Sequence, residues 1–314
     1  MVCTRFAPSP TGYMHLGNAW VAFLNWWWTR QHQGKVILRI EDIDRQRCRE
    51  EYISAIAEDL LWLGLDWDEG PDADGPYGPA VQSRRGDFYA EIFDRWKAQG
   101  AVYPCYCTRA RLRSIASAPH EGEPVSLYDG HCRHLTAEER ARSDKTPSWR
   151  LRMEEEQTGF SDLFHGWQER TLEPGQDDMV LLRADGMISY QLASASDDGA
   201  MGVTHVFRGY DLLPSTFGQL AILERLGYPK PVYGHLPLLV DSEGVRLSKR
   251  QAGITLRDFR RAGVSPEAII GKMLCWAGAE PSARPVSAAA AVRDIDFAGS
   301  ARLGETHICV DQNF

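Results

Sequence analysis

Three groups of residues carry side chains that could do chemistry. In the first, Gly12, His15 and Gly17 fall in a Pro- and Gly-rich turn ahead of a helix-compatible segment. Such a turn suits phosphate recognition, because backbone amides and a helix N-terminus present positive partial charge. The glycines let the backbone approach a nucleotide closely, and His15 can donate to a phosphate oxygen as charge builds on it. The second group is a short basic segment at 246–250.

The third group is a cluster of cysteines, Cys105, Cys107 and Cys132; the other four of the seven are scattered. In a reducing compartment such a cluster favours a metal site over a disulfide. Three thiolates with a fourth nitrogen or oxygen donor suit tetrahedral Zn²⁺, and a site closed by four protein ligands is structural. The sequence therefore predicts one structural zinc ion per chain.

The segments that must position these groups alternate between strand and helix. Residues 2–7 and 35–40 are expected to be strands, and 17–33 and 48–63 amphipathic helices. Trp26, Trp27 and Trp28 are expected to pack in the core. Further strands are expected at 149–153, 179–183 and 205–208, with a helix beginning near Tyr190. This alternation is typical of an α/β fold with a parallel sheet.

The same pattern predicts a Rossmann-type nucleotide-binding fold that is split by an insertion. Residues 1–100 and 176–250 are the expected halves of the catalytic domain, and 101–175 the inserted zinc-binding subdomain. Residues 251–314 are expected to form a short, mainly helical segment without room for another large domain. No internal repeat is visible.

Composition narrows the class of protein. The chain has 314 residues, 43% of them apolar, with a net charge of −8. A dedicated non-specific nucleic-acid binder would usually be basic, so any RNA contact is expected to be local. No apolar run approaches the roughly 18 residues of a membrane span, and no secretory signal is apparent. We therefore expect a cytoplasmic monomer without membrane contact.

Taken together, the turn that contains His15 and the basic segment at 246–250 resemble the HIGH and KMSKS signatures of class I aminoacyl-tRNA synthetases. Residues 5–18, RFAPSPTGYMHLGN, are similar almost residue for residue to the opening of the glutamyl and glutaminyl enzymes, with Asn18 in place of the second His. Residues 245–250, VRLSKR, keep the central Ser–Lys of the second signature. The resemblance extends over residues 2–278 and implies a class I synthetase fold.

The resemblance assigns ATP binding to both segments, through Gly12, His15, Gly17, Ser248 and Lys249. His15 and Lys249 are then the catalytic residues. Lys249 would stabilise the pentavalent phosphorus as a carboxylate attacks the α-phosphate of ATP, which arrives with Mg²⁺. No nucleophile from the enzyme is needed.

By the same resemblance, L-glutamate binds to Arg5, Ala7, Ser9, Glu41, Tyr190 and Arg208. The two arginines suit carboxylate recognition through bidentate hydrogen bonds. Glu41 follows a strand, where α/β sheets place ligand groups, and would bind the ammonium. Tyr190 would close the pocket. Taken singly, each Arg could form a surface ion pair, and Tyr190 could be a packed ring. Because these residues match the family's glutamate-binding residues in order and context, we favour the pocket.

The cysteine cluster is similar to the zinc site of this family. Shortened glutamyl enzymes use a Tyr four residues before the last Cys, which fits Tyr128, whereas full-length enzymes can use Cys-x-His, which fits His134. The early end of the chain favours the shortened branch. The expected ligands are therefore Cys105, Cys107, Tyr128 and Cys132.

The shortened branch implies a specific function. It activates glutamate with ATP to glutamyl-adenylate without tRNA and transfers it to queuosine at the wobble position of tRNA(Asp). The expected partners are ATP, L-glutamate and queuosine-containing tRNA(Asp). Two alternatives remain: a minimal glutamyl-tRNA synthetase that charges the 3′ end of tRNA(Glu), and a non-catalytic glutamate- or tRNA-binding module. The presence of His15, Lys249 and the glutamate-binding residues argues against the module.

Overall fold

The chain begins with a strand, a helix and a parallel strand. In the computed structural model, which describes residues 1–108, 110–112, 128–247 and 254–311, β1 (Cys3–Phe6) pairs with β2 (Lys35–Leu38). Between them α1 (Leu16–Gln31) is buried along most of its length, and Trp26, Trp27 and Trp28 lie in the core as predicted. Ser248 and Lys249 of the second signature lie outside the described residues.

The second half of the sheet follows the same pattern. Helix α6 (Tyr190–Ala200) leads to β8 (His205–Gly209), and α7 (Leu213–Leu226) leads to β9 (Val232–Leu236). Strands β8 and β9 are parallel, and β8 lies beside β1. The short 3-10 helix at Tyr210–Leu212 joins β8 to α7. The predicted α/β fold with parallel strands is therefore confirmed.

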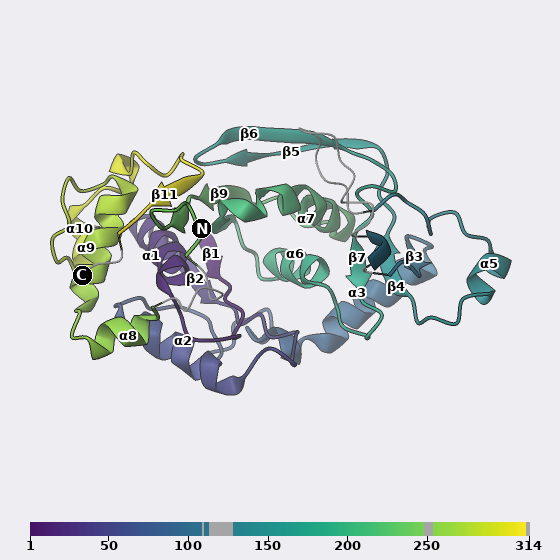
Figure 1. The fold of residues 1–314 in the computed structure, drawn as a ribbon, viewed down its shortest axis with the longest axis horizontal. Coiled ribbons are helices and arrows are strands. Elements are labelled where there is room, and N and C mark those ends of the chain that lie inside the picture. The colour runs from purple at the N-terminus through teal and green to yellow at the C-terminus, as the bar shows by residue number, and fades with distance from the viewer. Residues whose placement is uncertain (109, 113–127, 248–253, 312–314) are drawn as a thin grey trace.

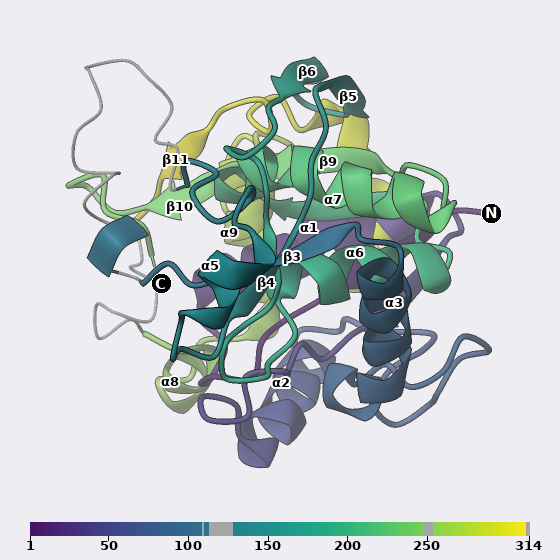
Figure 2. The same cartoon turned by 90° about the vertical axis from the view of Figure 1, so that its right-hand side faces the viewer.

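Two antiparallel groups of strands stand between these halves in the sequence. One is β3 (Val102–Cys105), β4 (Ser148–Leu151) and β7 (Val180–Leu182); with α5 (Ala137–Ala141) it lies at one end of the molecule (Figure 1). The other is the hairpin β5 (Glu156–Asp162) and β6 (Gly166–Leu172). Viewed from that end, β3 and β4 are in front and β5 and β6 run along the upper edge (Figure 2).

The hairpin extends the catalytic sheet, whose order is β6-β5-β9-β8. It lies inside residues 101–175, the range expected for the insertion, whereas β7 lies beyond that range and pairs with β4. Strand pairing therefore crosses the expected limits of the insertion. Strand β5, inside the expected insertion, pairs with β9 of the second half at Asp162. The domain limits themselves stay a prediction.

The segment after the sheet combines three helices with loops, so helices make up less of it than the mainly helical segment that was expected. It contains α8 (Leu256–Arg261), α9 (Pro266–Ala277) and α10 (Ala288–Asp294), which lie at the end of the molecule opposite β3 (Figure 1). Helix α10 packs on α1, and the final strand β11 (His307–Cys309) pairs with β10 (Leu238–Val240). A 3-10 helix at Phe297–Gly299 places Phe297 against the ring of Trp27.

Two helices and one short turn complete the described elements. Helix α2 (Glu50–Trp62) and α3 (Gly86–Ala98) follow β2, with a 3-10 turn at Gln82–Arg84 between them. Each buries one face, which includes Ile56 and Leu60 of α2 and Ile92 and Trp96 of α3. None of the helices in the described ranges combines the length and apolar character that a bilayer crossing requires.

Candidate active site

The predicted ATP- and glutamate-binding residues converge on one open cavity of about 500 Å³. It lies over the ends of β1 and β8 and is bordered by the segment before α1. The predicted residues that line it are Arg5, Ala7, Ser9, His15, Gly17, Glu41, Tyr190 and Arg208. Gly12 lies in the same loop but is not part of the lining. Arg246 and Leu247, just before the undescribed Ser248, also line the cavity.

His15 occupies the N-terminus of α1. Its Nδ1 accepts a hydrogen bond from the Gly17 amide at 3.1 Å, so the neutral ring carries its proton on Nε2. The backbone at His15 forms an antiparallel bridge with Thr255, and the Leu256 amide donates to the Met14 carbonyl at 2.9 Å. The first signature is thus joined to the chain that follows the second.

Arg5 and Glu41 belong to a buried network of ion pairs. Asp198 Oδ1 accepts from Arg5 Nε at 3.1 Å and from Arg39 Nη1 at 2.6 Å, and Glu41 Oε1 accepts from Arg39 Nη2 at 2.9 Å. Arg39 is fully buried. Buried charges need such partners to offset the loss of hydration. Two cations and two anions leave the network close to neutral.

The two carboxyls of this network titrate differently. Burial raises the pKa of Glu41, although Arg39 and Arg5 oppose the rise. Burial acts in the same direction on Asp198, but its ion pairs with Arg39 and Arg5 outweigh burial and lower its pKa. Asp198 is therefore the firm counter-charge of the arginines. Ionised Glu41 pairs with Arg39, and a further cation beside it, such as the ammonium of an amino acid, would favour its charged form more.

Arg208 is surrounded by neutral partners. Its Nη1 donates to Gln219 Oε1 at 2.6 Å, its Nη2 to Thr216 Oγ1 at 2.6 Å, and its Nε to His235 Nε2 at 3.1 Å. The side chain is buried, and in the described part of the chain no carboxylate lies within 4.0 Å of its guanidinium. A buried cation without a counter-ion favours an anionic ligand.

Tyr190 begins α6 at the mouth of the cavity, where 40% of the residue is exposed. This is the position from which it could cover a ligand. Asp42, next to Glu41, accepts hydrogen bonds from the amide and the hydroxyl of Ser83 at 2.8 and 2.6 Å. It holds the 3-10 turn and is not part of the cavity lining.

Four ionisable residues behind the cavity were not among the predicted site residues: Arg39, Asp198, Asp162 and His235. For two of them, Arg39 and Asp198, the sequence carried a signal, because their ionisable side chains lie in segments predicted as a strand and a helix. Arg39 lies within the predicted strand at 35–40, and Asp198 lies in a helix composed largely of small and apolar residues. A charge in such a place requires a buried partner, but the pattern does not say which one.

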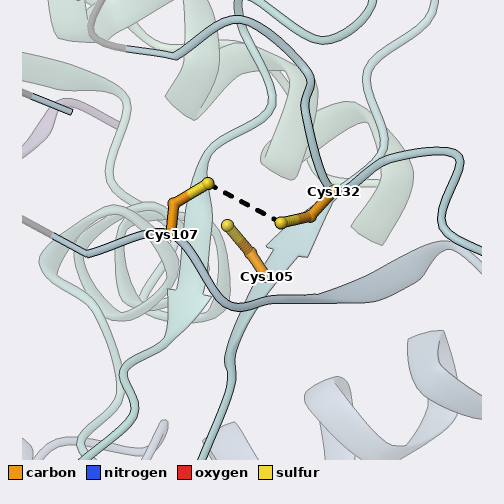
Figure 3. A group of neighbouring side chains, drawn as sticks. All are labelled: Cys105, Cys107 and Cys132. Atoms are coloured by element: carbon orange, nitrogen blue, oxygen red, sulfur yellow. Dashed lines mark hydrogen bonds between the residues drawn. The ribbon is translucent and has the colours of Figure 1, made fainter. Parts of the chain in front are cut away.

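The three clustered cysteines come together at the end of β3. Their sulfurs all lie within 4.8 Å of one another and point toward a common centre, with Cys107 Sγ 3.6 Å from Cys132 Sγ (Figure 3). Thiolates around a tetrahedral zinc ion stand about 3.8 Å apart, since Zn–S is about 2.3 Å. The donor set and spacing therefore fit a zinc ion.

Tyr128 lies beside this cluster, whereas His134 does not join it. The Tyr128 hydroxyl accepts from the Cys132 amide at 3.0 Å, and burial raises its pKa. His134 is exposed, and the potential ligand group among the described His, Cys, Asp and Glu residues contains the three cysteines alone. Of the two candidates for a fourth donor, Tyr128 has the better position.

The whole arrangement matches a known family. Residues 1–289 match the family model described as tRNA synthetases class I (E and Q), catalytic domain. The chain belongs to this synthetase family. This membership confirms the resemblance described above. It also confirms the class I fold and the glutamyl or glutaminyl branch that the resemblance implied.

Two groups of curated relatives are similar to this class I synthetase. Proteins named glutamyl-Q tRNA(Asp) synthetase, from Symbiobacterium thermophilum and Nitratidesulfovibrio vulgaris, are each 50% identical to it, and the matches cover 91% of this chain and 90% and 89% of the relatives. A glutamate–tRNA ligase of Symbiobacterium thermophilum is 41% identical over 94% of this chain but only 63% of the ligase.

Solved structures of the family have the same fold. Glutamate-tRNA synthetase from Elizabethkingia anophelis superposes with a TM-score of 0.81 at 27% identity, covering 99% of this chain and 68% of the other. A glutamate tRNA ligase from Elizabethkingia meningosepticum, solved in complex with its amino acid, gives a TM-score of 0.77 at 29% identity, covering 94% of this chain and 65% of the other.

Proposed function

We propose that this synthetase activates L-glutamate with ATP in the absence of tRNA and transfers it to queuosine at the wobble position of tRNA(Asp). The observation that carries the activation step is the cavity. It combines Arg208, a cation without a counter-ion, with Glu41, a carboxylate suited to an ammonium, next to the His15 turn. These charges complement a bound glutamate.

Activation requires positioning and stabilisation of charge. The glutamate carboxylate attacks the α-phosphorus of ATP, a P–O bond forms, and pyrophosphate leaves with Mg²⁺. His15, with its proton on Nε2, is oriented by Gly17 to donate to a phosphate oxygen. Arg5 and Arg208 would hold carboxylate oxygens and Glu41 the ammonium, so the nucleophile is held near the phosphate. Lys249 is proposed to stabilise the pentavalent phosphorus.

The acceptor is proposed from the relatives. The two relatives that match this chain over about nine-tenths of both lengths carry the name glutamyl-Q tRNA(Asp) synthetase. The glutamate–tRNA ligases are less similar and share only part of their length with it. This supports the modified base of tRNA(Asp) as acceptor, in preference to the 3′ adenosine of tRNA(Glu).

Zinc is proposed as a structural ion held by Cys105, Cys107, Cys132 and Tyr128. When bound, it would cross-link the end of β3 to the turn that carries Cys132. The cluster is not part of the lining of the cavity, so the activation step described above uses none of these residues.

One pair of assays tests the function. Glutamate-dependent ATP–pyrophosphate exchange without tRNA is expected, as is transfer of labelled glutamate to tRNA(Asp) that contains queuosine but not to tRNA(Asp) that lacks it. Exchange that appears only with tRNA(Glu) would instead indicate a minimal glutamyl-tRNA synthetase. Binding of glutamate without any exchange would indicate a non-catalytic module.

A further inference from the structure

Behind the cavity, Arg208 is the first of three side chains that are linked across neighbouring strands. In the β8–β9 register Arg208 is paired with His235, and in the β5–β9 register Asp162 is paired with Tyr233. Arg208 Nε donates to His235 Nε2 at 3.1 Å, and His235 Nδ1 lies 2.6 Å from Asp162 Oδ2. His235 and its partner Asp162 are both shielded from solvent.

These contacts determine where His235 carries its proton. Arg208 Nε has only a hydrogen to offer, so His235 Nε2 must be the acceptor and Nδ1 must carry the proton. Burial lowers the pKa of His235, although Asp162 opposes the fall, so the ring is neutral. For Asp162, the hydrogen bonds from His235 and the Phe164 amide outweigh burial and lower the pKa. Ionised Asp162 therefore selects the Nδ1–H tautomer.

The opposite tautomer would separate Arg208 from this chain. A proton on His235 Nε2 would face the N–H of Arg208 Nε, and two donors would point at each other. The ring cannot easily turn away, because it stacks on Tyr233 with centroids 5.8 Å apart and an interplanar angle of 7°. The Arg208 guanidinium also lies over Tyr233, 5.1 Å from the centroid. Tyr233 thus restricts both partners.

These contacts hold the Arg208 guanidinium in one orientation and leave some of its N–H donors without a partner among the described contacts. Within the described contacts, His235, Gln219 and Thr216 take three of its five N–H groups. The remaining two, one on each terminal nitrogen, match the two oxygens of a carboxylate. All three partners are neutral, so none of them forms an ion pair with Arg208 that a carboxylate ligand would have to displace.

We propose that Asp162 and His235 are positioning residues for amino-acid recognition: Asp162 sets the tautomer of His235, and His235 orients Arg208 toward the carboxylate of the substrate. The proposal rests on the proposed activation of glutamate, but not on the identity of the RNA acceptor. It differs from a purely structural role because it predicts that KM for glutamate changes while KM for ATP does not.

The test is steady-state ATP–pyrophosphate exchange with the full chain. The His235→Phe variant keeps a flat ring against Tyr233 but removes the acceptor for Arg208. It should raise KM for glutamate at least about tenfold, the scale of one lost hydrogen bond to a charged group, and change KM for ATP by less than about twofold. His235→Gln returns an acceptor oxygen and should recover part of the loss.

His205→Phe is the matched control. His205 lies on β8, as Arg208 does, but its ring contacts Trp28 and it does not line the cavity. This variant should leave KM for glutamate unchanged. A smaller rise for His235→Phe, an equal rise in both KM values, or no recovery with His235→Gln would overturn the proposal.

A second measurement needs no variant to fold. In ¹⁵N NMR spectra of the wild-type protein, His235 should show a protonated Nδ1 and an unprotonated Nε2. A protonated Nε2 would overturn the proposal. Failure of the proposed function is distinguishable, because the wild-type protein would then show no glutamate-dependent exchange at all.

Discussion

Gly17 lies directly against the carbonyl oxygen of Leu247. A Cβ atom added to Gly17 would stand 3.2 Å from Leu247 O and 3.1 Å from two ring atoms of His15. Leu247 directly precedes the predicted Ser248 and Lys249. The two signature segments therefore meet at Gly17. The backbone of Leu247 leaves little room for a side chain at this position.

The Gly17→Ala variant should lose activity without losing the fold. The methyl group would displace His15 or the Leu247 backbone by a few tenths of an ångström, and such misplacement of reacting groups is costly. We expect kcat for ATP–pyrophosphate exchange to fall, by less than the roughly 100-fold that a misplacement of about 1 Å can cost. Gly86→Ala is the control, because a Cβ at Gly86 meets nothing within 4 Å. Equal activity of the two variants would contradict the prediction.

Glutamate binding should weaken in acid. The pKa of Glu41 is raised by burial, so as pH falls through this raised value the carboxylate gains a proton and no longer attracts the substrate ammonium. KM for glutamate should therefore rise as the pH is lowered from neutral toward this raised pKa. Glu41→Gln should raise KM about 10- to 100-fold at neutral pH and remove this rise, as a hydrogen bond to a charged group is lost. A variant with the same pH profile as the wild type would exclude Glu41 as the cause.

Asp198→Asn should destabilise the protein as well as impair it. The substitution removes the shared counter-charge of Arg5 and Arg39 and leaves two buried cations with Glu41 alone. Breaking a buried pair in this way costs about 3–5 kcal/mol, measurable by urea denaturation. The control is Asp294→Asn, whose pair with Arg293 is exposed and should matter little. A loss for Asp198→Asn no larger than the control's would refute the account of the network.

Cys132→Ser should abolish zinc binding. With one sulfur replaced by a weaker donor, the remaining residues no longer form a site of three thiolates. Purified protein should contain about one zinc ion per chain by atomic emission before the substitution and almost none after it, with a lower Tm. Cys309→Ser, at an exposed cysteine away from the cluster, should keep both values. Full zinc content in Cys132→Ser would show that the metal is held elsewhere.

Tyr128 and His134 can be separated by the same measurement. Tyr128→Phe keeps the buried ring but removes the hydroxyl that lies against the Cys132 amide, and should lower zinc affinity. His134→Ala should have no effect, because His134 is exposed and outside the cysteine cluster. The reverse pattern in a competition titration with a chelator would make His134 the fourth ligand.

Local sequence was sufficient to find several of the residues that face the cavity. Arg5, His15, Glu41, Tyr190 and Arg208 each lie within a motif whose neighbours and order are characteristic, and the structure brings all five to one cavity. The cysteine cluster was recognised from the pair Cys105 and Cys107, followed 25 residues later by Cys132. The motifs around the cavity residues can be recognised in the sequence because each spans only a few consecutive residues.

Tertiary structure alone decided what holds those residues in place. Asp198 meets Arg5 across 193 residues, and Asp162 meets His235 across 73. A charged residue in a buried segment indicates that a partner is needed. Which residue is the partner depends on which strands are adjacent and in what register. The sequence by itself thus determined the chemistry of the cavity, whereas the pairing of β5, β9 and β8 decided which side chains orient Arg208, since only packing brings distant polar groups within hydrogen-bond distance.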